Sequence, residues 1–163
     1  MIFHLSIAAD DPARVASVIA ELWGGESFPF PPFPGSFTAM AGDDRNSAIE
    51  VYPRGLELRP ASGRRDVEAA FDAAPRRFGA THAAIATPLT EQQVHDLAAR
   101  EGWTAKTLSR GGVFGVIEFW LENSTMLEVL TEEMQADYLN RVTIDGWRAM
   151  LEQGHPGPPP GQQ

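Results

Sequence analysis

Two stretches of the sequence share one pattern and decide the fold: IFHLSIA at residues 2–8 and THAAIA at residues 81–86. In each, a histidine alternates with apolar residues, as in a β-strand that buries one face. A turn containing proline follows, and then an amphipathic helical pattern that ends at a glycine, Gly24 in the first copy and Gly102 in the second. Both the two histidines and the two glycines are 78 residues apart, so the sequence contains an internal repeat.

Short strand patterns follow each helical pattern. In the second copy they cover residues 105–110, 113–121 and 126–130, with turns at Gly111-Gly112 and Asn123-Ser124. In the first copy they cover residues 36–41 and 48–52, joined by a turn at 42–44. The remaining strand of that copy is replaced by a proline-rich segment at 28–34, which we expect to form an edge strand or a loop, because proline cannot donate into a ladder.

The sequence therefore predicts an α+β fold in which two tandem βαβββ modules form a cupped mixed sheet. We expect one domain over residues 1–153, made of a first module (1–59), a linker (60–79), a second module (80–130) and a C-terminal helix (131–153) that can break near Thr143. The linker holds a possible strand at 56–59 and a short helix around 66–73. Residues 154–163 read as a disordered proline-rich tail.

The net charge of −9 argues against a nucleic-acid partner, because an acidic surface repels phosphate backbones. The basic doublets Arg64-Arg65 and Arg76-Arg77 lie among acidic residues and are interpreted as a solvated helix. No apolar run is long enough to cross a membrane, and the first residues lack the pattern of a signal peptide. With no cysteine in the chain, thiolate sites and disulfides are excluded, and we expect a cytoplasmic protein.

Four residues occupy equivalent positions in the repeat: His4 and His82 on the first strands, and Glu50 and Glu128 on the last strands, each glutamate 46 residues after its histidine. In AIEVY at 48–52 and MLEVL at 126–130, the apolar side chains point one way and the glutamate points the other. The helices are expected to cover the apolar faces. Each opposite face therefore carries one histidine and one glutamate.

Two imidazoles and two carboxylates make a donor set for one divalent metal: zinc, nickel, manganese, cobalt or iron(II). Water would complete the coordination and leave positions for a substrate, as in catalytic metal sites. Two alternatives remain open. Each histidine and glutamate could satisfy one another as a buried hydrogen-bonded pair, or the chain could bind a ligand without metal.

Paired βαβββ modules with these histidine and glutamate positions resemble the vicinal-oxygen-chelate superfamily of glyoxalases, bleomycin-resistance proteins and dioxygenases, over about residues 1–130. The set His4, Glu50, His82 and Glu128 is similar to that of glyoxalase I, and departs from the His/His/Glu set of extradiol dioxygenases and fosfomycin thiol transferases. The resemblance implies a homodimer in which the modules pair either within one chain or across two.

The leading functional hypothesis is a metal-dependent, glyoxalase-like lyase or isomerase that acts on a small substrate with vicinal oxygens through an enediolate-type intermediate. Glu128, or otherwise Glu50, would move the proton. The alternative is a non-enzymatic protein that binds a drug or metabolite, and a dioxygenase comes third. No basic set for the carboxylates of glutathione is recognised in the sequence.

Further candidates line the expected cup. Strand parity points Glu118 and Trp120 into it, as a base or metal-orienting partner and as an apolar wall. The aromatic residues of the proline-rich segment, Phe28, Phe30 and Phe33, would either close over a substrate or pack onto the domain. Two other histidines are expected to have no role in the site: His95, on the second helix, and His155, in the tail.

Overall fold

The structure is a computed structural model that describes residues 2–63 and 67–152. Its elements follow one another in the order β1 (His4–Ala9), α1 (Pro12–Trp23), β2 (Glu26–Pro29), β3 (Phe37–Met40), β4 (Ala48–Pro53), β5 (Leu56–Arg59), β6 (Glu68–Phe71), β7 (Ala83–Ala86), α2 (Glu91–Glu101), β8 (Thr104–Arg110), β9 (Phe114–Leu121), β10 (Thr125–Leu130), α3 (Glu132–Arg141) and α4 (Ile144–Glu152).

The two modules have the same topology, as the repeat in the sequence predicts. The first sheet has the order β1-β4-β3-β2 and the second the order β7-β10-β9-β8. In each sheet the first and last strands of the module pair in parallel, and the other pairs are antiparallel. The proline-rich segment provides both an edge strand, β2, and the loop that follows it. Pro29 is tolerated in β2 because one side of an edge strand needs no donors.

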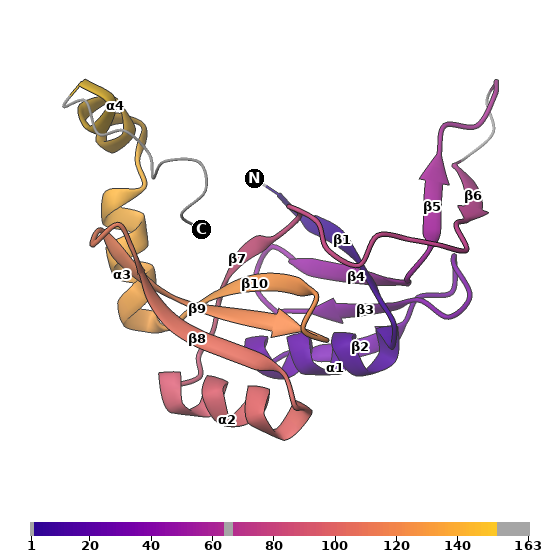
Figure 1. Cartoon of the computed structure of the whole chain (residues 1–163), viewed down its shortest axis with the longest axis horizontal. Helices are drawn as coiled ribbons and strands as arrows, with labels where there is room; N and C mark the ends of the chain where they lie inside the picture. Colours follow the sequence, from indigo (N-terminus) through magenta and orange to yellow (C-terminus); the bar gives the residue numbers. More distant parts are fainter. Residues whose placement is uncertain (1, 64–66, 153–163) are drawn as a thin grey trace.

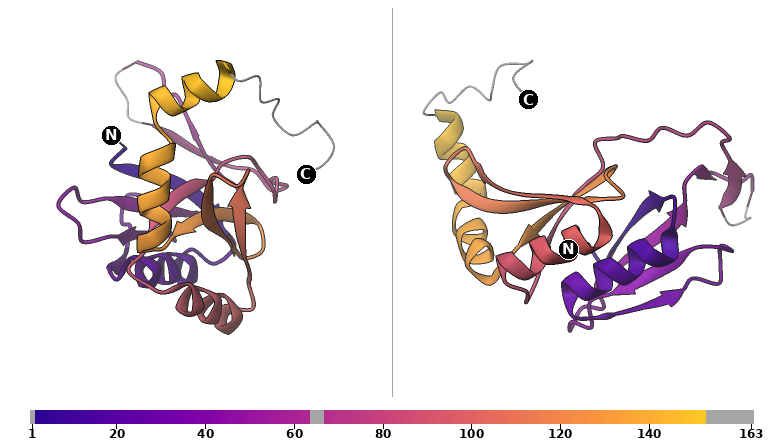
Figure 2. Two further views of the ribbon diagram at one scale, coloured as in Figure 1. Left: turned by 90° about the vertical axis from the view of Figure 1, so that its left-hand side faces the viewer. Right: turned by 60° about the horizontal axis from the view of Figure 1, so that its bottom comes forward.

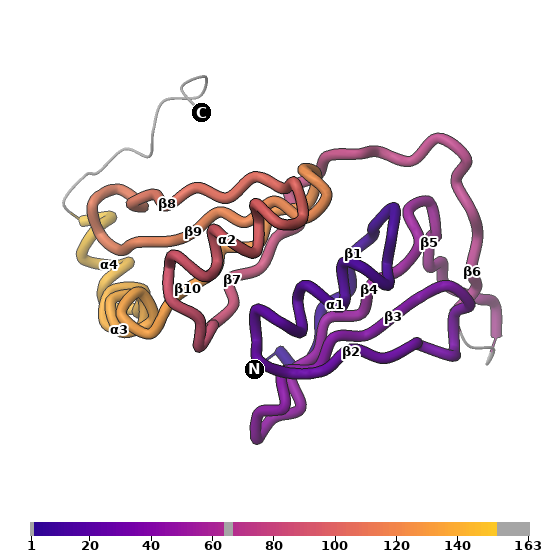
Figure 3. The backbone as a smooth tube through the Cα atoms, turned by 90° about the horizontal axis from the view of Figure 1, so that it is seen from below, coloured from indigo at the N-terminus to yellow at the C-terminus, as the bar shows by residue number. Residues whose placement is uncertain are grey.

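The helices α1 and α2 cover the same side of the two sheets, seen from below in Figure 3. They bury the odd-numbered side chains of the strands, among them Ile7, Val51, Phe119 and Val129, in one core with apolar residues of both helices. Phe3 was expected on this buried face but is 59% exposed, because it precedes β1. The even-numbered side chains of β1, β4, β7, β9 and β10 point away from α1 and α2, and we call this side of each sheet the open face.

Helices α1 and α2 each begin after a capping residue and end at the glycine that the sequence predicts. Pro12 starts α1 after the cap Asp11, whose side chain accepts the N–H of Arg14, and Thr90 forms a capping box with Gln93 at α2. Gly24 and Gly102 end the helices in the left-handed conformation, with φ of 67° and 73°. The N–H groups there reach back into the last turn, which satisfies its carbonyls.

Polar contacts join the two modules along a seam next to the apolar core that they share. The Thr87 hydroxyl donates to the carbonyl of Leu22 at the end of α1. The Glu122 carboxylate, in the β9–β10 turn, accepts the N–H groups of Asp10 and Asp11 at 2.7 Å each. Ion pairs between α1 and α2, such as Arg14 with Glu101 at 2.6 Å, continue the seam on the outer surface.

The linker differs from its prediction. Residues 68–71 form β6, which pairs with β5 in an antiparallel hairpin, so the expected helix around 66–73 is wrong. Alanine and glutamate favour a helix, but pairing with β5 overrides that weak preference. Arg76-Arg77 lies in an extended segment rather than in a solvated helix, whereas Arg64-Arg65 lies outside the described residues.

The C-terminal helix is broken as expected, with α3 ending at Arg141 and α4 beginning at Ile144. The α3 helix packs on β9, where Tyr138 and Phe114 meet edge to face with centroids 5.1 Å apart. The tail at 154–163 lies outside the described residues. Among the helices that the structure describes, none is long and apolar enough to cross a membrane.

Two arms project from the molecule on the side of the open faces. They are α4 at one end and the β5–β6 hairpin at the other, and both point away from α1 and α2 (Figures 1 and 2). Both arms expose apolar side chains: Ile144, Trp147 and Leu151 on α4, and Leu58 and Phe71 on the hairpin.

We expect Gly25→Ala to destabilise the first module, because the added methyl would lie 2.0 Å from the Met40 carbonyl oxygen at the close contact between α1 and β3. The expected loss is about 1–3 kcal/mol of unfolding free energy, measured by urea denaturation. The matched control is Gly79→Ala, where the nearest atom lies 4.0 Å away and φ is not left-handed. Equal stability of both variants would contradict the close packing.

Candidate functional site

Glu50 lies on the open face of the first sheet, where two hydroxyl groups bind it. Ser6, its parallel neighbour on β1, donates to Oε2 at 2.9 Å, and Tyr52 donates to the same oxygen at 2.8 Å. Ser6, Glu50 and Tyr52 share strand parity, which brings the three side chains together. The other oxygen, Oε1, accepts no hydrogen bond from the described residues.

Tyr52 is nearly buried although it lies on the open face. The loop after β2 folds over it, so that the rings of Phe30 and Phe33 meet the Tyr52 ring edge to face at 6.0 and 5.2 Å. Burial raises the pKa of Tyr52, and the hydrogen bond to Glu50 and its negative charge raise it further, to about 12. Phe30 and Phe33 thus pack onto the domain. Whether they also contact a substrate stays a prediction.

Glu128 lies on the open face of the second sheet, and a cation binds it. The Arg110 guanidinium donates through Nε at 2.8 Å and also through Nη2 to Glu128 Oε1, and its Nη2 lies 2.9 Å from Glu118. Burial opposes the charge of Arg110, but the bonds to Glu128 and Glu118 outweigh it and hold the pKa of Arg110 above its usual value. The Trp120 indole N–H lies 3.4 Å from Glu118 Oε2.

The two histidines lie at the edges where the sheets face one another. His4 and His82 both line a hollow of about 860 Å³ between β1 and β7. Both imidazoles are exposed, and His82 Nδ1 lies 2.9 Å from the carbonyl of Ala80. Neither Glu50 nor Glu128 lines this hollow. Glu50 pairs with Ser6, and Glu128 pairs with Ala84. In each module the histidine lies two residues before this partner of the glutamate.

The described residues of one chain contain no group of three or more histidine and acidic side chains that could hold a metal. The donor chemistry of each half nevertheless suits a divalent metal, because each module offers one imidazole and one carboxylate. The halves lie in different modules. A four-ligand site therefore requires two copies of the chain, with the first module of one copy meeting the second module of the other.

Three residues that touch the candidate carboxylates were not predicted from the sequence: Ser6, Tyr52 and Arg110. All three lie on the same face of their sheet as the glutamate, so the two-residue period of the strands could have indicated them. The partner of Arg110 was harder to predict, because its side chain reaches across β9 to Glu128. His95 bonds Thr107 at 2.9 Å on the outer surface, as expected for a histidine outside the site. His155 lies outside the described residues.

No protein-family model matches this sequence, and no curated protein matches it. Solved structures do match the fold. The fosfomycin resistance protein FosX from Listeria monocytogenes has a TM-score of 0.54 at 9% identity, covering 84% of this chain and 97% of that one. Lactoylglutathione lyase from Agrobacterium tumefaciens has a TM-score of 0.51 at 11% identity, covering 82% and 94%.

An integron cassette protein from V. cholerae gives a TM-score of 0.51 at 14% identity, covering 81% of this chain and 94% of that one. At such low identities the likeness concerns the fold alone. The chain has the vicinal-oxygen-chelate fold, which confirms the prediction made from its repeated strands.

We expect one of the two tyrosines to ionise only as the pH approaches 12, because the folded protein favours the protonated Tyr52 hydroxyl. The sign follows from linkage: between about pH 10 and 12 the unfolded chain loses the Tyr52 proton and the folded chain keeps it, so stability falls as the pH rises. An ultraviolet absorbance titration measures this. Tyr52→Phe should remove the late phase and Tyr138→Phe should leave it. A late phase that survives in Tyr52→Phe contradicts the assignment.

Proposed function

We propose that the protein is a metal-dependent lyase or isomerase that acts on a small substrate with vicinal oxygens. His4 and Glu50 of one copy and His82 and Glu128 of a second copy would hold one divalent metal. The proposal rests on one observation: each module carries a glutamate on the open face of its last strand and a histidine at the start of its first strand, His4 in β1 and His82 directly before β7, at the same spacing.

When bound, a divalent metal polarises substrate oxygens and stabilises the negative charge that develops when a proton leaves an adjacent carbon. The chain's own groups would hold and move that proton. The aromatic loop over Tyr52, with Phe30 and Phe33, would keep water from one side of the site. Trp120 would form an apolar wall on the other side.

A second copy is favoured because the apolar arms and the open faces lie on one side of the molecule. In the view of Figure 1, a two-fold axis along the line of sight, above the sheets, would set the second module of one copy over the first module of the other. The same rotation would bring α4 of one copy to the β5–β6 hairpin of its partner. Trp147 and Phe71, both more than half exposed, would then be covered.

Glu128 is the better candidate for the group that moves the proton. A carboxylate that holds the metal can act as a base only if substrate binding releases it from the metal. Once released, its negative charge needs another partner, because bound substrate excludes water from the site. Arg110 already binds Glu128 in this structure and could receive it. Glu50 has only neutral partners, Ser6 and Tyr52, which suit a carboxylate that stays in place.

Metal binding across two copies can be tested by mixing complementary variants. One variant carries His4→Ala with Glu50→Ala, and the other His82→Ala with Glu128→Ala, so that no ligand atom remains at the substituted positions. Neither homodimer should hold metal, but a heterodimer isolated with two different tags, neither of them polyhistidine, has one complete site and one empty site. We expect it to bind about half the metal of the wild-type dimer, measured by elemental analysis after loading with nickel, zinc, manganese, cobalt or iron(II).

His95→Gln is the matched control and should bind as much metal as the wild type. If the wild type binds metal but the heterodimer does not, the modules pair within one chain. If the wild type binds none, the metal-dependent enzyme is refuted.

The roles of the two carboxylates can be separated once a substrate is found by screening thiohemiacetals, 2-hydroxy acids, acyl thioesters and catechols. We expect Glu128→Gln to lower kcat at least about 100-fold while metal content falls much less, because glutamine keeps an oxygen ligand but loses the basicity. Glu50→Gln is the matched comparison. If both variants keep their turnover, neither carboxylate is the base, and Glu118 is the next candidate.

The second candidate function is a binding protein without catalysis, and one observation favours it. Both glutamates have hydrogen-bond partners within the chain, two hydroxyls at Glu50 and a guanidinium at Glu128, so protein groups already solvate each carboxylate. This function predicts tight binding of a drug or metabolite by metal-free protein, with no turnover.

A further inference from the structure

A pocket of about 410 Å³ lies beside Glu50 and is separate from the hollow between the histidines. Its floor is the open face of β1 and β4, with Ser6 and Tyr52, the two residues that donate to Glu50. The linker segment at 76–81 forms one wall, and the turn before β10 forms another. Its volume lies within the range of small-molecule sites.

Three arginines line the pocket, and two of them are neutralised. Arg54 pairs with Asp10 at 2.6 Å and with Glu122 at 3.2 Å, and Arg77 pairs with Asp10 at 3.3 Å and donates to the Glu122 carbonyl. These pairs hold the linker against the seam between the modules.

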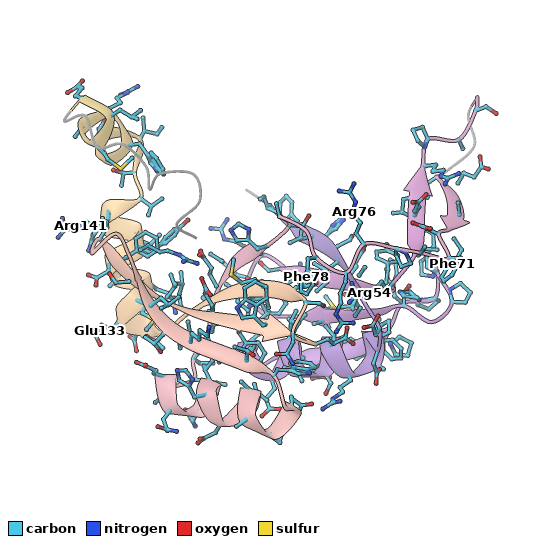
Figure 4. All side chains as sticks on the ribbon, viewed as in Figure 1. Arg54, Phe71, Arg76, Phe78, Glu133 and Arg141 are labelled. Carbon is cyan, nitrogen blue, oxygen red and sulfur yellow. The ribbon has the colours of Figure 1, made fainter. Side chains whose placement is uncertain are left out.

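Arg76 is different, because it forms no hydrogen bond or ion pair with any residue in the described part of the chain. Figure 4 shows its side chain extending into the space on the open side of the molecule, above Arg54. The side chain of the neighbouring Arg77 binds Asp10 and the Glu122 carbonyl, which anchors the linker next to Arg76 at the pocket wall.

Neutral groups in the pocket suit a ligand with a polar end and an apolar body. The hydroxyls of Thr81 and Thr125 line it and form no side-chain hydrogen bond with any described residue. Apolar side chains face the same space: Leu56, Leu58 and Phe78. Phe78 is 65% exposed, so its ring is available to contact the apolar part of a ligand.

We infer that this pocket binds a small organic anion, a carboxylate or phosphonate with a short apolar body. Arg76 binds the oxyanion through its planar fork, which matches two oxygens at once. The Thr81 and Thr125 hydroxyls donate to the remaining lone pairs, and Phe78 and Leu56 contact the apolar body.

The inference extends the proposed function, since it assigns an anionic group to the substrate of the site at Glu50. It rests on that proposal for catalysis only, because the pocket belongs to a single chain and requires no metal. Arg76 is therefore a specificity-determining residue for the ligand. Arg76 is part of the Arg76-Arg77 doublet, which the composition of the sequence alone predicts to lie on a solvated surface.

The test uses benzoate, a planar carboxylate with an apolar body, and its neutral analogue benzamide. Both are titrated into chelator-treated, full-length protein and followed by nuclear magnetic resonance shifts of backbone amides. We expect saturable benzoate binding with shifts at residues 76–81, and much weaker binding of benzamide. Arg76→Gln should weaken benzoate binding about tenfold, which corresponds to about 1.4 kcal/mol, and should leave benzamide binding unchanged.

Arg141→Gln is the matched control, since Arg141 on α3 is also exposed and has no ion pair or hydrogen bond from its side chain in the described part of the chain. Its benzoate affinity should equal that of the wild type. The inference is overturned if benzoate does not saturate, or if Arg76→Gln and Arg141→Gln bind it equally. A protein that binds benzoate through Arg76 but holds no metal would refute the metal-dependent enzyme and leave this site standing.

Discussion

The Glu122 carboxylate is the contact on which the arrangement of the two modules depends. It lies in the tight turn between β9 and β10, where Glu122 and Asn123 both have positive φ, of 50° and 52°. That turn carries the carboxylate to the start of α1, where it accepts two backbone N–H groups. A negative charge at a helix N-terminus is favourable, because the amides there have no partner within the helix. The second sheet is thereby fixed against the first helix, and Arg54 and Arg77 join the same cluster to hold the linker in place.

This side-by-side packing explains why the chemistry is spread over the molecule. Both helices lie on one side of the sheets, so both open faces look to the other side. The seam uses the helices and the turn, which leaves both glutamates on the open faces, whereas the two histidines line the hollow between β1 and β7. The two open faces are chemically unequal: Glu50 is held by hydroxyl groups under an aromatic loop, and Glu128 is held by an arginine. The duplicated modules therefore present different environments to equivalent carboxylates.

Much of the fold could be predicted because the determinants are local and occur twice. Strand parity placed Ile49 and Val51 in the core and Glu50 opposite them, and the glycines at 24 and 102 marked both helix ends. The prediction failed for residues 68–71, where the intrinsic preference is helical but a hydrogen-bonded neighbour, β5, was available. It also failed for Arg76-Arg77, because composition indicates only that a charge is solvated. Composition does not reveal that Asp10 pairs with Arg77, which also donates to the Glu122 backbone carbonyl, whereas Arg76 forms no such pair among the described residues.

The sequence by itself determined the repeat, the βαβββ order, the helix caps and the two faces of each sheet. These follow from residue spacing, backbone preferences and the two-residue period of a strand. Only the tertiary structure decided which partners the carboxylates have, that the two histidines share one hollow while the two glutamates do not, and that Arg76 borders a pocket beside Glu50. Those features depend on side chains from distant parts of the chain. Strand spacing fixes the direction in which a side chain points, but the packing of one module against the other decides what it meets.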